Sequence, residues 1–253
     1  LKNTNIEICL HRNIYYDNFF KQEELNRLDP EGTVLAKLDH IQKAMDILRN
    51  NFPYCYSLIE QSVSKLFIYK SETQRSFASI QANGTGFLNL KPEHDEIAIL
   101  EDITHQCGHN IFYRILYDKK RLFNIPPDTP LREITGKIEE YRTVFGAFNA
   151  MLPYCLSNLC SWNCLKNGIF KGQQLHEFIG RFTFRMFKFK IDVGNFSHNE
   201  IFTEEGKTLN RTFVEVFDKI ENDYGSVLKK YDISNQDYEF DYQKFLILNP
   251  YKI

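Results

Sequence analysis

One segment of the chain, from about residue 93 to residue 117, combines the spacing of a long helix with two histidines. Its hydrophobic positions recur every three or four residues, which is the period of a helix with one buried face. These positions are Ile97, Leu100, Ile103, Thr104, Cys107, Ile111 and Ile115. His105 and His109 lie four residues apart, so they project from the same side of such a helix. The segment therefore predicts a packed helix with two imidazoles one turn apart, and the rest of the fold has to accommodate it.

The two histidines belong to the run His105-Gln106-Cys107-Gly108-His109. Two imidazoles at this spacing reach one metal ion, as they do in the HExxH helices of metalloproteases. The predicted helix is otherwise apolar on this face, so two imidazoles there call for an explanation. The alternative is that both are ordinary hydrogen-bonded histidines. We expect His105 and His109 to be metal ligands.

Gln106 stands where an HExxH motif has its glutamate. In a hydrolytic zinc enzyme that glutamate is the general base for the metal-bound water. A neutral amide does not accept this proton, so the sequence disfavours hydrolysis. A 2-His-1-carboxylate site needs no base at this position, and Fe(II) is its usual metal. A zinc peptidase whose catalytic Glu is replaced by Gln106 remains the alternative.

The third metal ligand is expected on a second helix, from about residue 131 to residue 151. Glu140 is the preferred candidate because its predicted face is largely buried, and Glu139 is the alternative. An acidic pair at the start of a helix is also typical of a solvated surface. His176 and His198 are the remaining candidates. A guanidinium holds a carboxylate in a bidentate pair, so Arg142 is the candidate for binding an acidic co-substrate, ahead of Arg114 and Arg181.

The other segments predict a mostly helical α+β fold. Asn83-Gly84 between two apolar runs indicates a hairpin, so we expect a small antiparallel sheet beside the metal-binding helix, as in zincins. A run of phenylalanines from 178 to 189 permits helix or strands, and Thr203 is expected to begin a last long helix. The chain is predicted to be one domain, 1–253, with 1–35 and 231–253 as peripheral segments.

Charge and cysteine content limit the partners. The 31 basic and 33 acidic residues leave a net charge of −2, which removes the general electrostatic case for nucleic acid or an anionic membrane. The apolar runs are far shorter than the roughly 20 residues of a membrane span. Six cysteines without a CxxC pair indicate reduced thiols, and no secretory segment is apparent. We therefore expect a cytoplasmic protein.

Three segments together carry a resemblance to a known family. They are the run Glu101–His109, the stretch from Thr129-Pro130-Leu131-Arg132 into the predicted helix at Tyr141–Leu152, and the late segment Phe202–Leu209. Over about residues 80 to 215 the chain resembles the HExxH-type, 2-oxoglutarate-dependent peptide β-hydroxylases found with bacterial ribosomal peptide biosynthesis. It departs from them at Gln106, where the family has Glu, and at Gly146, where many relatives have a histidine.

The resemblance implies iron at His105 and His109 and hydroxylation of a peptide side chain at its β carbon. We therefore expect an Fe(II)- and 2-oxoglutarate-dependent dioxygenase, with Gln106 forming hydrogen bonds next to the metal ligands. Arg142 would hold the far carboxylate of 2-oxoglutarate. The third ligand is not carried over from the family, so Glu140 rests on the residue pattern alone. A peptide-binding protein without catalysis is the second alternative.

Overall fold

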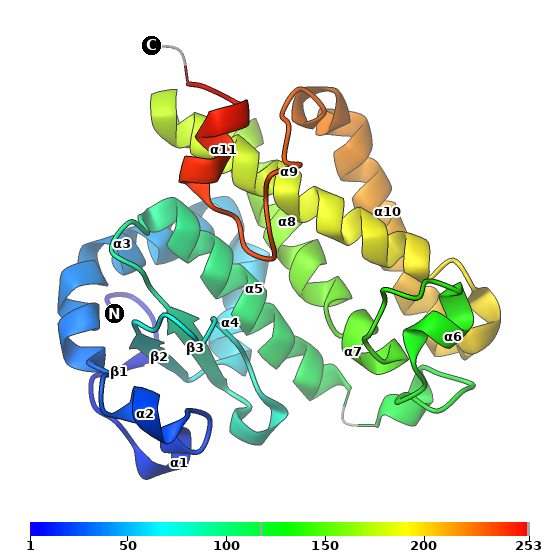
Figure 1. Ribbon diagram of the computed structural model, residues 1–253, viewed down its shortest axis with the longest axis horizontal. Coiled ribbons are helices and arrows are strands. Elements are labelled where there is room, and N and C mark those ends of the chain that lie inside the picture. The colour runs from blue at the N-terminus through cyan, green and yellow to red at the C-terminus, as the bar shows by residue number, and fades with distance from the viewer. Residues whose placement is uncertain (117, 252–253) are drawn as a thin grey trace. The chain divides into compact units, whose positions relative to one another are not determined.

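The computed structural model describes residues 1–116 and 118–251 and divides into two compact units. The first unit spans Leu1–Leu116 and the second spans Tyr117–Ile253. Helices dominate, and one small three-stranded sheet accompanies them (Figure 1). The mostly helical character predicted from the sequence is confirmed, and the single-domain organisation stays a prediction.

The first unit surrounds a small sheet with helices (Figure 1). Side chains of a strand alternate between its two faces. On one face, Phe67 and Phe87 join a buried aromatic cluster with Tyr16 and Phe20. On the other face, α5 packs on β3 and α3 packs on β2. The elements are β1 (Glu7–Cys9), α1 (Ile14–Asp17), α2 (Gln22–Leu25), α3 (Pro30–Asn51), α4 (Pro53–Ser62), β2 (Lys65–Tyr69), a 3-10 turn (Ile80–Ala82), β3 (Thr85–Asn89) and α5 (Glu96–Ile115).

Residues 1–35, which were expected to be peripheral, take part in this unit. β1 is the edge strand of the sheet, and it pairs with β2. Tyr16, Phe20 and Leu25 are buried against the strands. The segment therefore covers one face of the sheet, because the aromatic side chains of β2 and β3 need an apolar partner there.

The sheet is parallel, with the order β1-β2-β3, so the predicted antiparallel arrangement is wrong. Lys65 pairs with Thr85 and Tyr69 pairs with Asn89 in the same direction. A two-residue hairpin requires positive φ at both central residues of a type I′ turn. Asn83 has φ −56° and ψ 134°, and Gly84 has φ 92°, which are values of a type II turn instead.

The second unit consists of helices and connecting loops. α8, α9 and α10 pack on one another, and α11 packs on α9. Figure 1 shows α8, α9 and α10 as its long helices, with α6 and α7 short. The elements are a 3-10 turn (Lys119–Arg121), α6 (Leu131–Thr135), α7 (Val144–Phe148), α8 (Met151–Lys166), α9 (Gly172–Asn195), a 3-10 turn (Asn199–Ile201), α10 (Glu204–Leu228) and α11 (Tyr242–Leu248).

The predicted continuous helix from 131 to 151 is wrong. α6 ends at Thr135 because Gly136 follows it with φ 70°, the left-handed value that stops a helix. Thr143 then caps a new helix, its hydroxyl accepting a hydrogen bond from the N–H of Gly146 at 3.0 Å. Residues 136–143 therefore form a loop, and Glu140 and Arg142 lie in this loop.

For the phenylalanine-rich run from 178 to 189, where helix and strands were both open, the structure shows a helix, as part of α9. The predicted start of the last long helix is confirmed. Thr203 caps the start of α10, the last long helix. Three buried cysteines lie on α8: Cys155, Cys160 and Cys164.

The tail from residue 231 was also expected to be peripheral, but it packs against α9. A Cβ at Gly180 would lie 2.8 Å from the ring of Phe245 and 2.9 Å from that of Phe240, so this glycine allows the close contact. Phe245 is fully buried. Among the described residues, every helix is too short or too polar to cross a bilayer.

Candidate functional site

The two predicted metal ligands lie side by side on α5. The ring centroids of His105 and His109 are 5.1 Å apart, and the ring planes meet at 86°. The ring of Tyr113, one turn further on, lies 6.2 Å from that of His109. Together with Glu101, these side chains form a half-buried stripe along the helix. The spacing of four residues thus places both imidazoles on one face, as predicted.

The surroundings of the pair differ from the expectation. The apolar side chains of α5 are buried on its other sides, whereas Glu101 and Asp102 begin the turn before His105. Both acidic residues are half-buried, like the histidines. The prediction of an apolar face around the histidines is therefore wrong, because the helix turns its apolar residues toward the sheet and the neighbouring helices.

Hydrogen bonds of Asp95 and Asn110 hold α5 in place. Asp95 caps its start, and a carboxylate oxygen accepts a hydrogen bond from the N–H of Ile97 at 2.8 Å. The fully buried Asn110 donates to the carbonyl of Thr85 at 3.1 Å and accepts from the N–H of Gly84 at 2.8 Å. The backbone around His109 is thus tied to the beginning of β3, so the histidine pair rests on a rigid support.

Close packing against β3 also determines the chemistry of Cys107. A Cβ at Gly86 would lie 3.7 Å from the sulfur of Cys107, so the helix approaches the strand closely here. Burial raises the pKa of the Cys107 thiol to about 12. The thiolate is the metal-binding form of cysteine, so Cys107 does not compete with the histidines as a ligand. Gln106 is buried as well, and its backbone carbonyl accepts from Asn110.

Glu140 and Arg142 contact each other in the loop of the second unit. The carboxylate of Glu140 accepts from the guanidinium of Arg142 at 2.8 Å and 2.6 Å. The buried Asp192 binds the same guanidinium at 2.6 Å and 3.1 Å. Asn195 donates to Glu140 at 3.2 Å. The predicted ligand and the predicted clamp are therefore partners of one ion cluster.

This cluster changes the ionisation of its members. Hydrogen bonds from Arg142 hold the pKa of Glu140 below its ordinary value, against the opposing effect of burial. Burial raises the pKa of Asp192, although Arg142 pulls it the other way. The guanidinium of Arg142 stays charged throughout. At neutral pH one cation thus lies between two carboxylates.

Glu140→Gln is expected to destabilise the metal-free protein at neutral pH by about 1 kcal/mol or more, because it weakens charge-assisted bonds in a partly buried cluster. The folded pKa of Glu140 lies below its unfolded value, so the stabilisation is present above the unfolded pKa and is lost as pH falls through the folded one. Thermal melts of both proteins in the presence of a chelator should show a difference in Tm that shrinks on acidification.

The exposed Glu139 provides the matched control for this prediction. Glu139→Gln makes the same chemical change one position earlier and should move the Tm little. A Glu140→Gln difference that stays constant from neutral to acidic pH would contradict the assignment of the stabilisation to an ionised Glu140.

The remaining candidates from the sequence lie elsewhere. His176 is surrounded by aromatic rings, its Nδ1 lies 3.1 Å from the hydroxyl of Tyr242, and burial lowers its pKa. His198 lies 3.4 Å from Glu200 at the surface. Arg114 donates to the carbonyl of Gln61. Arg181 binds Glu177 at 2.8 Å, so it has a structural partner already.

The histidine pair supplies two of the three protein donors of a 2-His-1-carboxylate site. Within residues 1–116 and 118–251, no group of three or more His, Cys, Asp and Glu side chains is placed to hold a metal ion. The described residues thus fit such a site in part, with the third donor missing.

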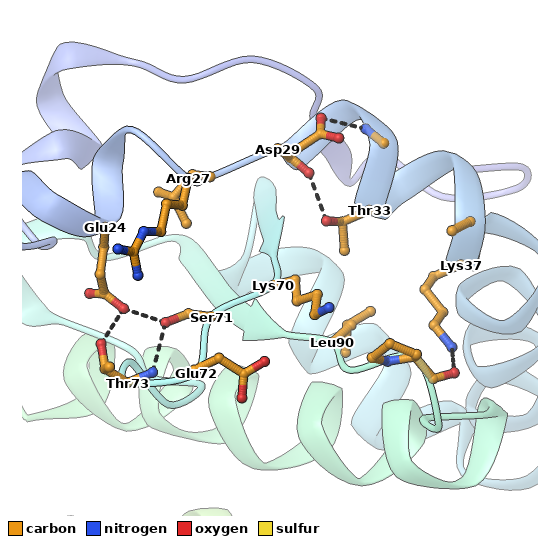
Figure 2. Close-up of a pocket in the computed structure, with 14 residues that line it drawn as sticks. Glu24, Arg27, Asp29, Thr33, Lys37, Lys70, Ser71, Glu72, Thr73 and Leu90 are labelled. Atoms are coloured by element: carbon orange, nitrogen blue, oxygen red, sulfur yellow. Dashed lines mark hydrogen bonds between the residues drawn. The ribbon is translucent and has the colours of Figure 1, made fainter.

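A pocket that the sequence did not predict lies in the first unit, where β2 and β3 end (Figure 2). Ligands bind at the carboxyl ends of parallel strands in open α/β sheets. The sequence predicted an antiparallel sheet, in which neighbouring strands end at opposite edges. The edge at which β2 and β3 both end was therefore not predicted to carry a site. The basic residues at 27, 37 and 70 are spread over three segments, so no local motif marks them.

Neither a protein-family model nor a curated protein matches the chain.

Proposed function

We propose that the protein is an Fe(II)- and 2-oxoglutarate-dependent hydroxylase that acts on a peptide side chain at its β carbon. The observation that carries the proposal is the histidine pair: two imidazoles one turn apart, 5.1 Å between ring centroids, on the half-buried face of a firmly held helix. The resemblance of the segments around residues 101–109, 129–152 and 202–209 to the HExxH-type peptide β-hydroxylases supports the same function.

Gln106 supports an oxygenase over a peptidase. It is buried next to the pair, and its neutral amide lacks the basicity that activates water for hydrolysis. When bound, Fe(II) and 2-oxoglutarate would supply the activation of oxygen. His105 and His109 would bind the metal and orient it, and Asn110 would hold their helix against β3.

Two further observations support finer parts of the proposal. A zincin-like arrangement is favoured by the packing of α5 on β3, the strand just before it in the chain. Residence in the cytoplasm is favoured by six free cysteines, because oxidising compartments tend to pair them. Glu140 as third ligand and Arg142 as the 2-oxoglutarate clamp stay predictions.

One observation favours a second candidate, a peptide-binding protein without catalysis. Glu140 and Arg142 neutralise each other, and Asp192 completes the cluster. Neither side chain is therefore available for metal or co-substrate without opening a partly buried ion pair, which costs several kcal/mol when one partner is left uncompensated. A protein that has lost its chemistry would keep such a cluster for stability alone.

The experiment that separates the candidates combines the protein with Fe(II), 2-oxoglutarate, air and a library of peptides. A hydroxylase should convert 2-oxoglutarate into succinate and add one oxygen atom to a peptide, both of which mass spectrometry detects. Bound iron without consumption of 2-oxoglutarate for every peptide would contradict the hydroxylase and support the binding protein.

Gln106→Glu adds a second discrimination. In an oxygenase this change should leave Fe(II) binding intact and should create no peptidase activity. Robust cleavage of a generic peptide by the zinc-loaded variant would show that the restored carboxylate acts as the missing general base. The protein would then be a zinc peptidase whose catalytic glutamate is absent.

A further inference from the structure

The pocket at the carboxyl end of the sheet has the size of a small-molecule site. Its volume is about 620 Å³, within the range of roughly 300–1,000 Å³ typical of ligand pockets. The residues that follow β2 and β3 form one side, and the first turns of α3 form the other (Figure 2). All of its lining residues belong to the first unit.

Several polar groups of the pocket are satisfied within the protein. Glu24 accepts hydrogen bonds from the hydroxyls of Ser71 and Thr73. Although burial opposes it, the hydrogen bonds to Glu24 lower the pKa of this carboxyl, so it is an anion at neutral pH. Lys37 is 8% exposed, and its ammonium donates to the carbonyls of Pro92 at 2.6 Å and His94 at 2.7 Å. These groups therefore stabilise the protein around the pocket.

Polar groups at the start of α3 also have hydrogen-bond partners within the protein. Asp29 accepts from the N–H of Gly32 at 2.9 Å, and its carbonyl accepts from the hydroxyl of Thr33 at 2.6 Å. The carboxylate of Asp29 therefore occupies the position where an anion would bind at a helix N-terminus. A ligand anion has to find its partners elsewhere in the pocket.

Three charged side chains in the pocket carry no such bonds. In the part of the chain that the structure describes, no hydrogen bond or ion pair engages the side chain of Arg27, Lys70 or Glu72, and all three residues are exposed. Figure 2 shows the Arg27 side chain extending toward the segment that carries Ser71, with Lys70 lying between this segment and Leu90. The lining holds three basic and three acidic side chains in all, and among them Arg27 and Lys70 are the cations that a ligand anion can engage.

The rest of the lining is apolar. It comes from the connection before α3, from α3 itself and from the segment after β3. Leu90 is fully buried. The apolar members are Leu28, Ala36, Leu90 and Pro92. Such a lining binds the hydrocarbon part of a ligand, while a few polar groups fix its orientation.

We propose that this pocket binds a ligand with one carboxylate and an apolar body, Arg27 and Lys70 holding the carboxylate and Leu28, Leu90 and Pro92 contacting the body. A carboxylate offers two oxygens to the two cations and carries a single negative charge, so the acids of the lining repel it less than a more highly charged anion. A phosphate carries about −1.5 to −2 at neutral pH and would be repelled by Glu24, Asp29 and Glu72. The carboxylate belongs to a free organic acid or to an acidic residue of a peptide. The site is independent of His105 and His109.

The test uses two pairs of probes and NMR of the isotope-labelled full chain. N-acetyl-leucine represents a free acid, with N-acetyl-leucinamide as its uncharged control. Acetyl-Leu-Glu-amide represents a peptide, with acetyl-Leu-Gln-amide as its control. We expect saturable shifts of the amides of Ser71 and Thr73 with at least one of the acids and with neither control. The acid that binds more tightly identifies the source of the carboxylate.

Variants test which charged residues of the pocket contact the ligand. Arg27→Ala and Lys70→Ala should each weaken binding of the acid about three- to tenfold, because both lose one exposed charge-assisted contact. Glu72→Gln should strengthen it by up to about threefold, since a repelling charge is removed. Lys43→Ala, an exposed lysine of α3 outside the pocket, should change nothing. His105→Ala should also keep full affinity, which separates this site from the proposed metal centre.

Three results would overturn the proposal. The first is equal binding of an acid and its uncharged control, and the second is no saturable binding of either acid. The third is inorganic phosphate that binds more tightly than both acids with the same dependence on Arg27 and Lys70. Weaker binding of the acid by Glu72→Gln would also contradict the proposal, because removal of a repelling charge should strengthen the binding of an anion.

Discussion

Alanine at His105 or at His109 is expected to abolish stoichiometric binding of a divalent metal ion while the fold survives. Each substitution removes one of two imidazoles whose ring centroids are 5.1 Å apart. Loss of an outer partner of a metal ligand already costs tenfold to a hundredfold in affinity, so loss of a ligand should exceed a hundredfold. Both side chains are half-buried, so the change removes little core volume. Metal analysis after equilibration with Fe(II) or Zn²⁺ measures the effect.

His198→Ala is the matched control, because this residue was a candidate ligand and lies beside Glu200 at the surface. It should bind metal like the native chain. Circular dichroism should show unchanged helix content in all three variants. Unchanged metal stoichiometry in both α5 variants, or its loss in His198→Ala, would contradict the assignment of the centre to α5.

The second large effect is expected at Gly206, in the first turn of α10. A Cβ there would lie 2.1 Å from the carbonyl oxygen of Leu122, which is backbone and has little freedom to move. The same carbonyl accepts a hydrogen bond from the N–H of Thr203, the capping residue of α10, at 3.0 Å. Gly206→Ala should therefore destabilise the second unit by about 3 kcal/mol or more, through overpacking and loss of the cap.

Gly194→Ala provides a control of opposite sign. This glycine also lies in a helix, α9, but a Cβ would meet no atom within 4 Å. Alanine should stabilise the helix by up to about 1 kcal/mol. Urea unfolding followed by the fluorescence of Trp162, the single tryptophan, reports on the unit that contains both glycines. Equal urea midpoints for Gly206→Ala and Gly194→Ala would contradict the close contact between Gly206 and the backbone of Leu122.

The late segment Phe202–Leu209 thus has a physical explanation. Thr203 caps the helix, and Glu204 and Glu205 place negative charge in its first turn, where the helix dipole favours it. Gly206 lets the helix approach the backbone of Leu122. From the sequence alone the cap was predictable, because it is a local pattern. The role of the glycine was not, since its partner lies more than 80 residues earlier.

The difference between local patterns and contacts between distant residues also explains why α5 was predicted correctly and the direction of the sheet was not. The spacing of apolar residues in α5 depends on one face of one helix, so its extent was predicted within a few residues. The parallel direction of β2 and β3 depends on the connection of residues 70–84, which returns the chain to the start of the sheet before β3 begins. Asn-Gly permits both turn types, so this local pattern did not determine how the connection runs.

The candidate site was predicted in part for the same reason. His105 and His109 come together because they share a helix, so their spacing fixes their proximity. The pairing of Arg142 with Asp192 joins residues 50 positions apart. The sequence pattern predicts helix across the loop that carries Glu140 and Arg142, because a glycine inside a helical pattern is compatible with both a continuing helix and the C-cap that Gly136 forms. The pocket beside Arg27 and Lys70 lies where two parallel strands end, so it was not predictable without the parallel direction of the sheet.

The most direct test of the metal centre is an anaerobic titration of the native chain with Fe(II) in the presence of 2-oxoglutarate, followed by visible absorption. A 2-oxo acid that chelates iron held by two histidines gives a weak charge-transfer band. We expect the band to saturate at about one iron per chain and to be absent in His105→Ala and His109→Ala. Absence of saturable Fe(II) binding by the native chain, or an unchanged band in both variants, would contradict the account.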